Sequence, residues 1–277
     1  MYLKVIIFIL SILFICLLFK TSRKPENFVL KSRTRRKNLV FTSAGDKTNF
    51  VSHWLNDKKN RNFDIWVIYY GNSPLNKYKS EVDYWERRKG SKFQNFYYLW
   101  EKYKHTIKSY RKIFILDDDI IMKTKDINKC FQMSYQYNLW LMQPSFLPSS
   151  KLSFDINKRK QNTILRYTNF VEINTPLIDI SVLDDIMKKY NPILVGWGID
   201  LLMSWVLINR PDYNSHKIAI LDNVWCINPH DRAKGNVREI SKLQPTEKRA
   251  GIYKLYAQRN NINFTNKDIK TLQYVYK

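Results

Sequence analysis

The chain has 277 residues, of which 44% are hydrophobic and 15% aromatic. This composition excludes a disordered chain and is typical of a globular domain with a substantial core. The formal net charge of +23 is spread along the whole sequence, which indicates a solvated, lysine-rich surface. A nucleic-acid-binding face is the alternative explanation of the charge.

The first predicted element is a membrane helix. Residues 5–19 contain no charged side chain and lie between Lys4 and Lys20. As a helix they span roughly 22 Å, and the flanking lysines can extend to the headgroups on either side. We therefore predict an N-terminal signal-anchor over residues 1–20, with a cleaved signal peptide as the alternative.

A basic stem is predicted over residues 21–37, because this stretch is rich in Lys and Arg and lacks apolar periodicity. We predict a single-pass membrane protein whose catalytic domain lies in an ER- or Golgi-like lumen, the usual placement behind a short-tailed anchor. The positive charges that follow the anchor favour the opposite, cytosolic placement.

One α/β catalytic domain is predicted over residues 38–277. Strand patterns occupy residues 38–43, 63–70, 113–116, 139–144, 168–174 and 217–228, and helical patterns occupy 49–56, 93–109, 125–137, 179–190 and 201–208. Because strands alternate with helices, we expect a mostly parallel central sheet with flanking helices. Such sheets bind ligands beyond the carboxyl ends of their strands, so the loops after the first three strands should meet at one site.

Three consecutive carboxylates, Asp117, Asp118 and Asp119, follow the apolar run 113–116. Like charges in a poorly solvated site repel and destabilise the fold unless a cation is bound, and carboxylate oxygens suit Mg²⁺ or Mn²⁺. If the strand continues through the triplet, Asp117 and Asp119 share one face and form a D-x-D metal motif. A helix N-cap cluster is the alternative.

Four residues further along are candidates for the same site. His230 follows the strand at 217–228 and is either a third metal ligand or a solvated loop histidine. Gly198 permits close approach of the backbone to a ligand, and the Trp197 ring suits the apolar face of a sugar. Asp200 could accept the proton of an attacking hydroxyl group. The alternative makes Asp200 an N-cap and Trp197 a core residue.

The order of these features resembles glycosyltransferases of the GT-A fold, and among them the DUF707 family. The resemblance covers residues 38–235 and rests on the basic stem, Asp117-Asp118-Asp119, Gly196-Trp197-Gly198-Ile199-Asp200, and a strand through Leu221-Asp222 that leads to His230. The stretch after His230, Asp231-Arg232-Ala233-Lys234, departs from the family pattern. The resemblance implies a nucleotide-sugar donor that is held through a divalent metal by the D-x-D carboxylates.

We therefore expect a metal-dependent glycosyltransferase that moves a sugar from a nucleotide-diphosphate-sugar to a hydroxyl group of a glycan, glycoprotein or lipid. Asp200 would be the general base of an inverting reaction, or would orient the substrates of a retaining one. The expected contacts are Thr42, Ala44, Gly45, Tyr69, Gly71, Asp117 and Asp118 for the nucleotide, Trp197, Gly198 and Gln143 for the substrate, and Asp117, Asp119 and His230 for Mn²⁺ or Mg²⁺. Gln143 could instead be a core residue.

Two alternatives come from other functional classes. One is a membrane-tethered nucleic-acid-binding protein or metal-dependent nuclease, which the basic charge and the acidic triplet would suit. The other is a carbohydrate-binding relative without activity. No nucleic-acid-binding motif is present in the sequence, so we expect no nucleic-acid partner.

Overall fold

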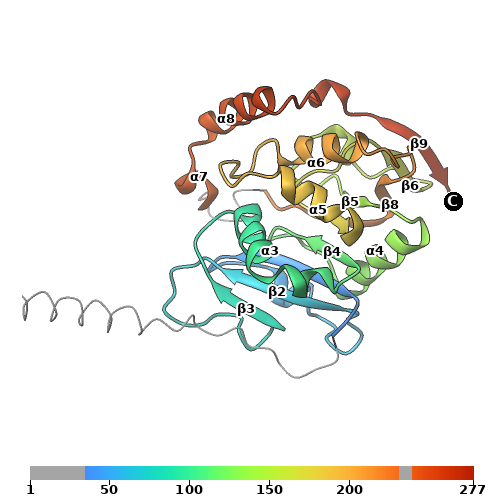
Figure 1. Cartoon of the computed structure of the whole chain (residues 1–277). Coiled ribbons are helices and arrows are strands. Elements are labelled where there is room, and N and C mark those ends of the chain that lie inside the picture. Colours follow the sequence, from blue (N-terminus) through green and yellow to red (C-terminus); the bar gives the residue numbers. More distant parts are fainter. Residues whose placement is uncertain (1–34, 231–238) are drawn as a thin grey trace, which may run out of the picture.

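Within residues 35–230 and 239–277, which the computed structural model describes, nine strands form one sheet (Figure 1). They are β1 (Asn38–Ala44), β2 (Phe63–Tyr69), β3 (Tyr84–Arg87), β4 (Lys112–Ile115), β5 (Leu141–Phe146), β6 (Thr163–Thr168), β7 (Leu177–Asp179), β8 (Ile218–Cys226) and β9 (Thr271–Tyr276). Their order in the sheet is β3-β2-β1-β4-β7-β5-β8-β6-β9.

The sheet is mixed, so the expectation of a mostly parallel sheet is wrong. Strands β3, β2, β1 and β4 pair in parallel, as do β5 and β8. The pairs β4–β7, β7–β5, β8–β6 and β6–β9 are antiparallel. The strand expected at residues 168–174 is also wrong, because β6 ends at Thr168 and the next strand begins at Leu177.

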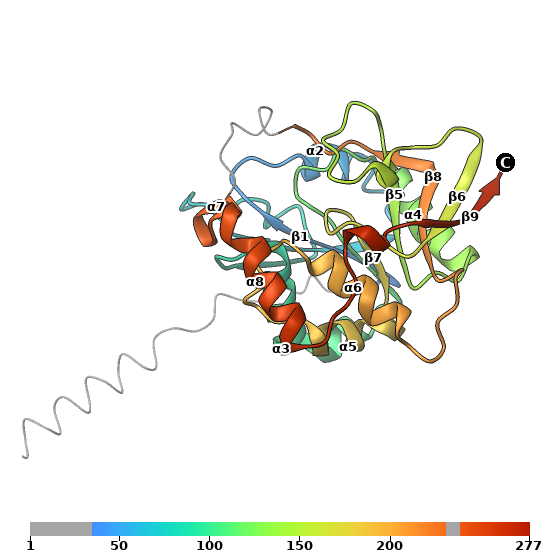
Figure 2. The ribbon, with the colours of Figure 1, turned by 90° about the horizontal axis from the view of Figure 1, so that it is seen from above.

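Helices cover both faces of the sheet. They are α2 (Phe50–His53), α3 (Lys92–Lys108), α4 (Thr124–Gln136), α5 (Ile180–Lys189), α6 (Ile199–Ile208), α7 (Glu239–Leu243) and α8 (Thr246–Arg259). Helices α3, α5 and α6 pack on one face, and α2 and α4 on the other (Figure 2).

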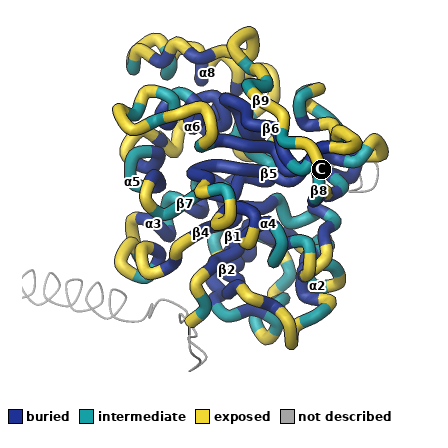
Figure 3. The backbone as a smooth tube through the Cα atoms, turned by 90° about the vertical axis from the view of Figure 1, so that its right-hand side faces the viewer, coloured by how far each residue is buried: buried dark blue, intermediate teal, exposed yellow. Residues whose placement is uncertain are grey.

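Alternating side chains of the strands supply the two cores. In β1, Leu39 and Phe41 belong to the core under α3, whereas Val40 and Ala44 belong to the core under α2 and α4. Because both faces are covered, the strands are apolar on both sides rather than on one. The central strands are accordingly buried, and exposed segments lie mainly on the outer helices and loops (Figure 3).

The folded domain includes the end of the predicted stem. Arg36 donates from its backbone N to Asp64 Oδ2 at 3.2 Å and from its guanidinium group to Asp64 Oδ1 at 3.0 Å. The predicted anchor over residues 1–20 lies outside the described residues. Between residues 35 and 230, and from 239 to 277, no helix has the length and hydrophobicity that crossing a membrane requires.

A fully buried ion pair joins β6 to β8. Arg166 Nε lies 2.8 Å from Asp222 Oδ2, and the second carboxylate oxygen accepts from Arg166 Nη2 at 3.1 Å. We expect Asp222→Asn to lower the free energy of unfolding by about 3 kcal/mol, because the guanidinium group stays buried without its counter-charge. Urea denaturation measures this change. Asp155→Asn removes the exposed ion pair with Lys158 and should leave stability unchanged; equal effects of the two substitutions would contradict the prediction.

Candidate functional site

The loops after β1, β2 and β4 line one cavity of about 960 Å³. The C-terminal part of the chain completes its wall through Ile240, Lys242, Leu243, Arg249 and Asn266. As expected for an α/β sheet, the cavity lies beyond the carboxyl ends of parallel strands. The predicted site residues that line it are Gly45, Gly71, Asp117, Asp118, Asp119, Trp197, Gly198 and Asp200.

The other predicted site residues do not line this cavity; they are Thr42, Ala44, Tyr69, Gln143 and His230. Thr42 and Ala44 are fully buried inside the sheet. The Tyr69 hydroxyl donates to Asp46, and Gln143 is fully buried among protein groups. His230 is exposed to solvent. A position at a strand end therefore did not place these side chains in the cavity.

The carboxylate triplet lies in a turn rather than in a strand. β4 ends at Ile115, and the Ile120 N–H donates to the Asp117 carbonyl oxygen at 3.2 Å, closing the turn. The expected alternation of the triplet across a strand is therefore wrong, and all three residues line the cavity. The triplet is not a helix N-cap either, because α4 begins at Thr124 after Lys123.

Groups of this chain already compensate part of the negative charge of the triplet. Lys92 Nζ lies 2.8 Å from Asp117 Oδ1, and the Gly45 N–H donates to Asp118 Oδ2 at 3.0 Å. The electrostatic conflict that suggested a metal is thus partly resolved by a lysine. Asp118 has a supporting role, because its carboxylate ties the loop after β1 to the loop after β4.

The donor atoms for a metal are two or three carboxylates from one turn. In the part of the chain that the structure describes, no three His, Cys, Asp or Glu side chains are grouped as a metal site. Mg²⁺ commonly takes only one or two carboxylates and completes its shell with phosphate and water oxygens. The triplet suits that kind of site, which needs substrate oxygens as well as protein ligands.

Lys92 connects the triplet to the segment that carries Ile173 and Asn174. It is the first residue of α3, whose N-terminus is fixed by a capping box between Ser91 and Gln94. Its ammonium group also donates to the carbonyl oxygens of Ile173 at 2.6 Å and Asn174 at 3.1 Å. The sequence did not reveal this residue, because one lysine among many carries no pattern of its own.

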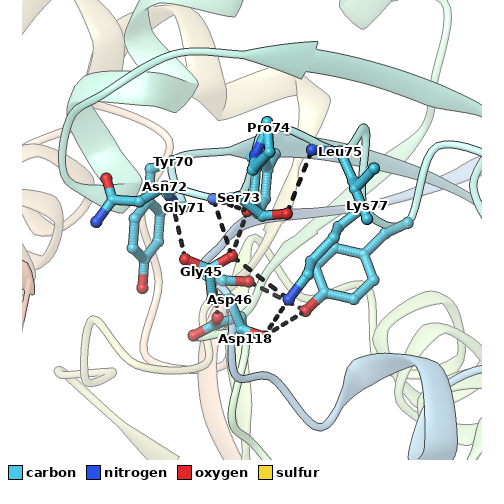
Figure 4. A network of polar contacts seen from close by, with 12 residues as sticks. Gly45, Asp46, Tyr70, Gly71, Asn72, Ser73, Pro74, Leu75, Lys77 and Asp118 are labelled. Carbon is cyan, nitrogen blue, oxygen red and sulfur yellow. Dashed lines mark hydrogen bonds and ion pairs between the residues drawn. The ribbon is translucent and has the colours of Figure 1, made fainter.

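Asp46 holds the loop after β2 against the loop after β1 (Figure 4). Its carboxylate accepts from the backbone N–H groups of Asn72 at 2.8 Å and Ser73 at 3.3 Å, and from the Tyr69 hydroxyl. The bond from Tyr69, followed by the one from Asn72, lowers the pKa of Asp46 to about 2. The wall that carries Gly45 and Gly71 is therefore fixed without a ligand.

Asp200 is a buried carboxylate in the first turn of α6. Burial raises its pKa to about 6, although backbone N–H groups, among them Leu201 N at 3.0 Å from Oδ1, oppose the shift. The N-cap of α6 is Gly198, so the N-cap alternative for Asp200 is wrong. A carboxylate with this pKa can accept a proton from a hydroxyl group near neutral pH.

Trp197 lines the same cavity as Asp200. Its side chain is 44% exposed, and its ring meets the ring of Tyr253 edge-on with centroids 5.4 Å apart. The alternative that Trp197 is a core residue is therefore wrong. Tyr253, from α8, fixes the ring from behind and leaves its outer part open to a ligand.

Gly198 allows this arrangement, because its φ of +85° is a left-handed conformation and a Cβ atom would lie 2.3 Å from the Tyr253 ring. We expect Gly198→Ala to lower the free energy of unfolding by about 2 kcal/mol and to reduce activity by displacing Trp197 and Asp200. Chemical denaturation and the initial rate measure the two effects. Gly251→Ala is the matched control, since its Cβ would have no neighbour within 4 Å. It should preserve the activity, and because Gly251 lies inside α8 it should not lower the free energy of unfolding. A stable, active Gly198→Ala variant would contradict the prediction.

Glu172 is a cavity residue that the sequence analysis did not identify. Its side chain is buried, and its pKa is raised to about 8: burial is the main cause and the charges of Asp200 and Asp117 add to it, whereas a hydrogen bond from Ser153 and the charge of Lys92 oppose the shift. A lone carboxylate inside the apolar stretch Phe170-Val171-Glu172-Ile173 was the feature that could have revealed it.

Comparison with known proteins gives a likeness of fold alone. No family model matches the chain, and neither does any curated protein sequence, so the resemblance to the DUF707 family stays a prediction. The structure of S. aureus TarS shares 11% identity, with 83% of this chain and 44% of TarS covered and a TM-score of 0.49. The chain thus spans less than half the length of TarS.

A second structure supports an argument about the fold. TarS 1–349 in complex with UDP-GlcNAc is 12% identical, with 83% of this chain and 68% of that chain covered and a TM-score of 0.52. The chain therefore has a fold similar to that of the glycosyltransferase TarS.

Proposed function

We propose that this protein is a glycosyltransferase, which transfers a sugar from a nucleotide-diphosphate-sugar to a hydroxyl group of an acceptor. The observation that carries the proposal is the meeting of three strand-end loops, the carboxylate triplet and the buried base candidate Asp200 in one cavity. The fold similarity to TarS, which was solved with UDP-GlcNAc, supports it.

The donor would bind at the ends of β1, β2 and β4. Gly45 and Gly71 line this part of the cavity together with Lys47, Lys89 and Lys92. Lysine ammonium groups are suited to a diphosphate, because they neutralise its charge without fixing a single orientation. We therefore assign the nucleotide to the two loops and the diphosphate to the lysines beside the triplet.

A divalent ion, Mn²⁺ or Mg²⁺, is part of the proposal. Asp119 would be its most direct protein ligand, and Asp117 would contact either the ion or the ribose. When bound, the ion would stabilise the negative charge that grows on the diphosphate leaving group. His230 stays a predicted ligand without support from the cavity, since it lies outside the lining.

The acceptor would bind at Trp197 and Asp200. Asp200 would remove the proton from the attacking hydroxyl group in an inverting reaction, and the exposed Trp197 ring would stack on the apolar face of an acceptor sugar. In a retaining reaction Asp200 would orient the reactants instead. A glycan, glycoprotein or membrane lipid remains the proposed acceptor, with a lumenal domain on a single-pass anchor as the proposed topology.

The direct test is nucleotide release from a panel of donors. Full-length protein is incubated with UDP-GlcNAc, UDP-glucose, UDP-galactose and GDP-mannose, with Mn²⁺ or with EDTA, and released nucleoside diphosphate is measured. We expect one donor to be consumed preferentially and EDTA to suppress its consumption. Failure with every donor would refute the proposal, and steeply salt-dependent DNA or RNA binding in its place would favour the nucleic-acid alternative.

A further inference from the structure

Amide side chains hold the Glu172 carboxyl group in one orientation. Asn157 Nδ2 donates to its Oε2, and Asn174 Nδ2 donates to its Oε1 at 2.9 Å. Gln143 holds the Glu172 backbone and the Asn157 side chain: its Oε1 accepts the Glu172 N–H at 2.6 Å, and its Nε2 donates to Asn157 Oδ1 at 3.1 Å. Gln143 and Asn157 are fully buried. The carboxyl group is therefore oriented before any ligand binds.

Glu172 lies between the two ends of the cavity. The next residue, Ile173, contacts both ends: its carbonyl oxygen accepts from Lys92 Nζ at 2.6 Å on the donor side, and its backbone N–H donates to the Asp200 carboxylate on the acceptor side. Under the proposed function, the diphosphate lies at Asp117 and Lys92, and the attacking hydroxyl group lies at Asp200. The transferred sugar joins these two positions, so it occupies the space beside Glu172.

A carboxyl group at this position is costly for the fold. Burial disfavours its ionised form, and the amide network that surrounds it must itself be desolvated. The carboxyl oxygens accept hydrogen bonds from Asn157, Asn174 and Ser153, and together they offer about four lone-pair positions, so one position remains. A lone pair at the cavity wall is suited to accept a hydrogen bond from a hydroxyl group, which sugars carry in abundance.

We propose that the Glu172 carboxyl group binds a hydroxyl group of the transferred sugar and thereby selects the donor sugar. The inference rests on the proposed function and adds a specificity-determining residue to it. Glu172 neither forms a bond nor transfers a proton in this role. It recognises one hydroxyl group and sets the position of the sugar between Asp117 and Asp200.

The test compares Glu172→Ala with wild type on the donor that wild type prefers in the panel and on analogues that each lack one hydroxyl group. Because a hydrogen bond to a charged or polarised group is lost, we expect kcat/KM for the full donor to fall about 10- to 100-fold. The same substitution should have no effect with the analogue that lacks the recognised hydroxyl group. The Kd for UDP or GDP, whichever nucleotide the preferred donor carries, should stay within about twofold of wild type, because the nucleotide does not reach Glu172.

Glu86→Ala is the matched control. Glu86 is also buried and is bound by Tyr98 and Lys102, but it does not line the cavity. It should affect all donors equally. If Glu172→Ala does not fold, Glu172→Gln keeps the volume of the side chain and should also weaken discrimination among the analogues. Equal losses on every analogue, or no loss at all, would overturn the inference while leaving the glycosyltransferase proposal intact. Absence of nucleotide binding and donor turnover in wild type would refute both.

Discussion

Asp200→Asn should reduce kcat about 10²- to 10⁴-fold, because an amide cannot accept the proton of the attacking hydroxyl group. The Kd for UDP should stay unchanged, since Asp200 lies on the proposed acceptor side of the cavity. Steady-state rates and calorimetric titration with UDP measure the two quantities. Asp212→Asn, on the surface, should keep the full rate. A normal kcat in Asp200→Asn would remove Asp200 from the mechanism.

The raised pKa of Asp200 also predicts how the reaction rate depends on pH. Because only the ionised carboxylate can act as a base, the wild-type rate should rise with pH up to about 6 and then level off. The residual rate of the Asn variant should lack this rise. The comparison separates a base from a residue that only orients the acceptor, because an orienting residue would not impose its own ionisation on the rate.

The raised pKa of Asp200 also links its ionisation to stability. The folded state holds the proton more tightly than the unfolded state, whose carboxyl group ionises near 3.8, so stability falls as pH rises from about 4 to about 6. At pH 7, Asp200→Asn should therefore be more stable than wild type by about 3 kcal/mol. Below pH 4 the difference should vanish. A variant that is less stable at neutral pH would show that Asp200 serves the fold rather than the reaction.

Asp119→Asn should abolish metal-dependent turnover, with a loss of about 10³-fold. The same substitution removes one of three neighbouring carboxylates, so the protein should be equally or more stable without metal. Rates at increasing Mn²⁺ concentration and urea denaturation in EDTA measure the two effects. Asp118→Asn is the comparison variant. It also removes one carboxylate of the triplet, but its side-chain oxygen can still accept the hydrogen bond from the Gly45 N–H that joins the two loops. Destabilisation of Asp119→Asn together with full activity would refute the metal assignment.

The sequence predicted that Asp117, Asp118, Asp119 and Asp200 lie in one region, and all four line the cavity. These carboxylates lie next to apolar segments, where a charged side chain is costly unless it has a function. The carboxyl ends of parallel strands meet at one edge of the sheet, so residues there are expected to lie close together. His230 and Gln143 were placed at the site because each lies at or near the end of a predicted strand. A strand fixes where a residue lies along the sheet, but the direction of its side chain depends on neighbouring strands that the sequence does not name.

The residues that the sequence missed owe their role to contacts between distant segments. Lys92 meets Asp117 and the carbonyl oxygens of residues 173 and 174 only in the folded chain. The mixed sheet has the same cause: β7 has three residues, too few for a recognisable pattern, and it inserts antiparallel between β4 and β5. Long-range pairing therefore accounts for the main errors in both the fold and the site.

The residues that line the cavity are spread widely along the chain, and this affects when the cavity can form during translation. The residues that line it run from Ser43, near the end of β1, to Asn266. A nascent chain that has passed the triplet and Asp200 still lacks the part that carries Ile240 and Lys242. The cavity wall can be complete only after the segment through Asn266 has left the ribosome, so N-terminal fragments that end before Ile240 should lack the activity proposed for the cavity.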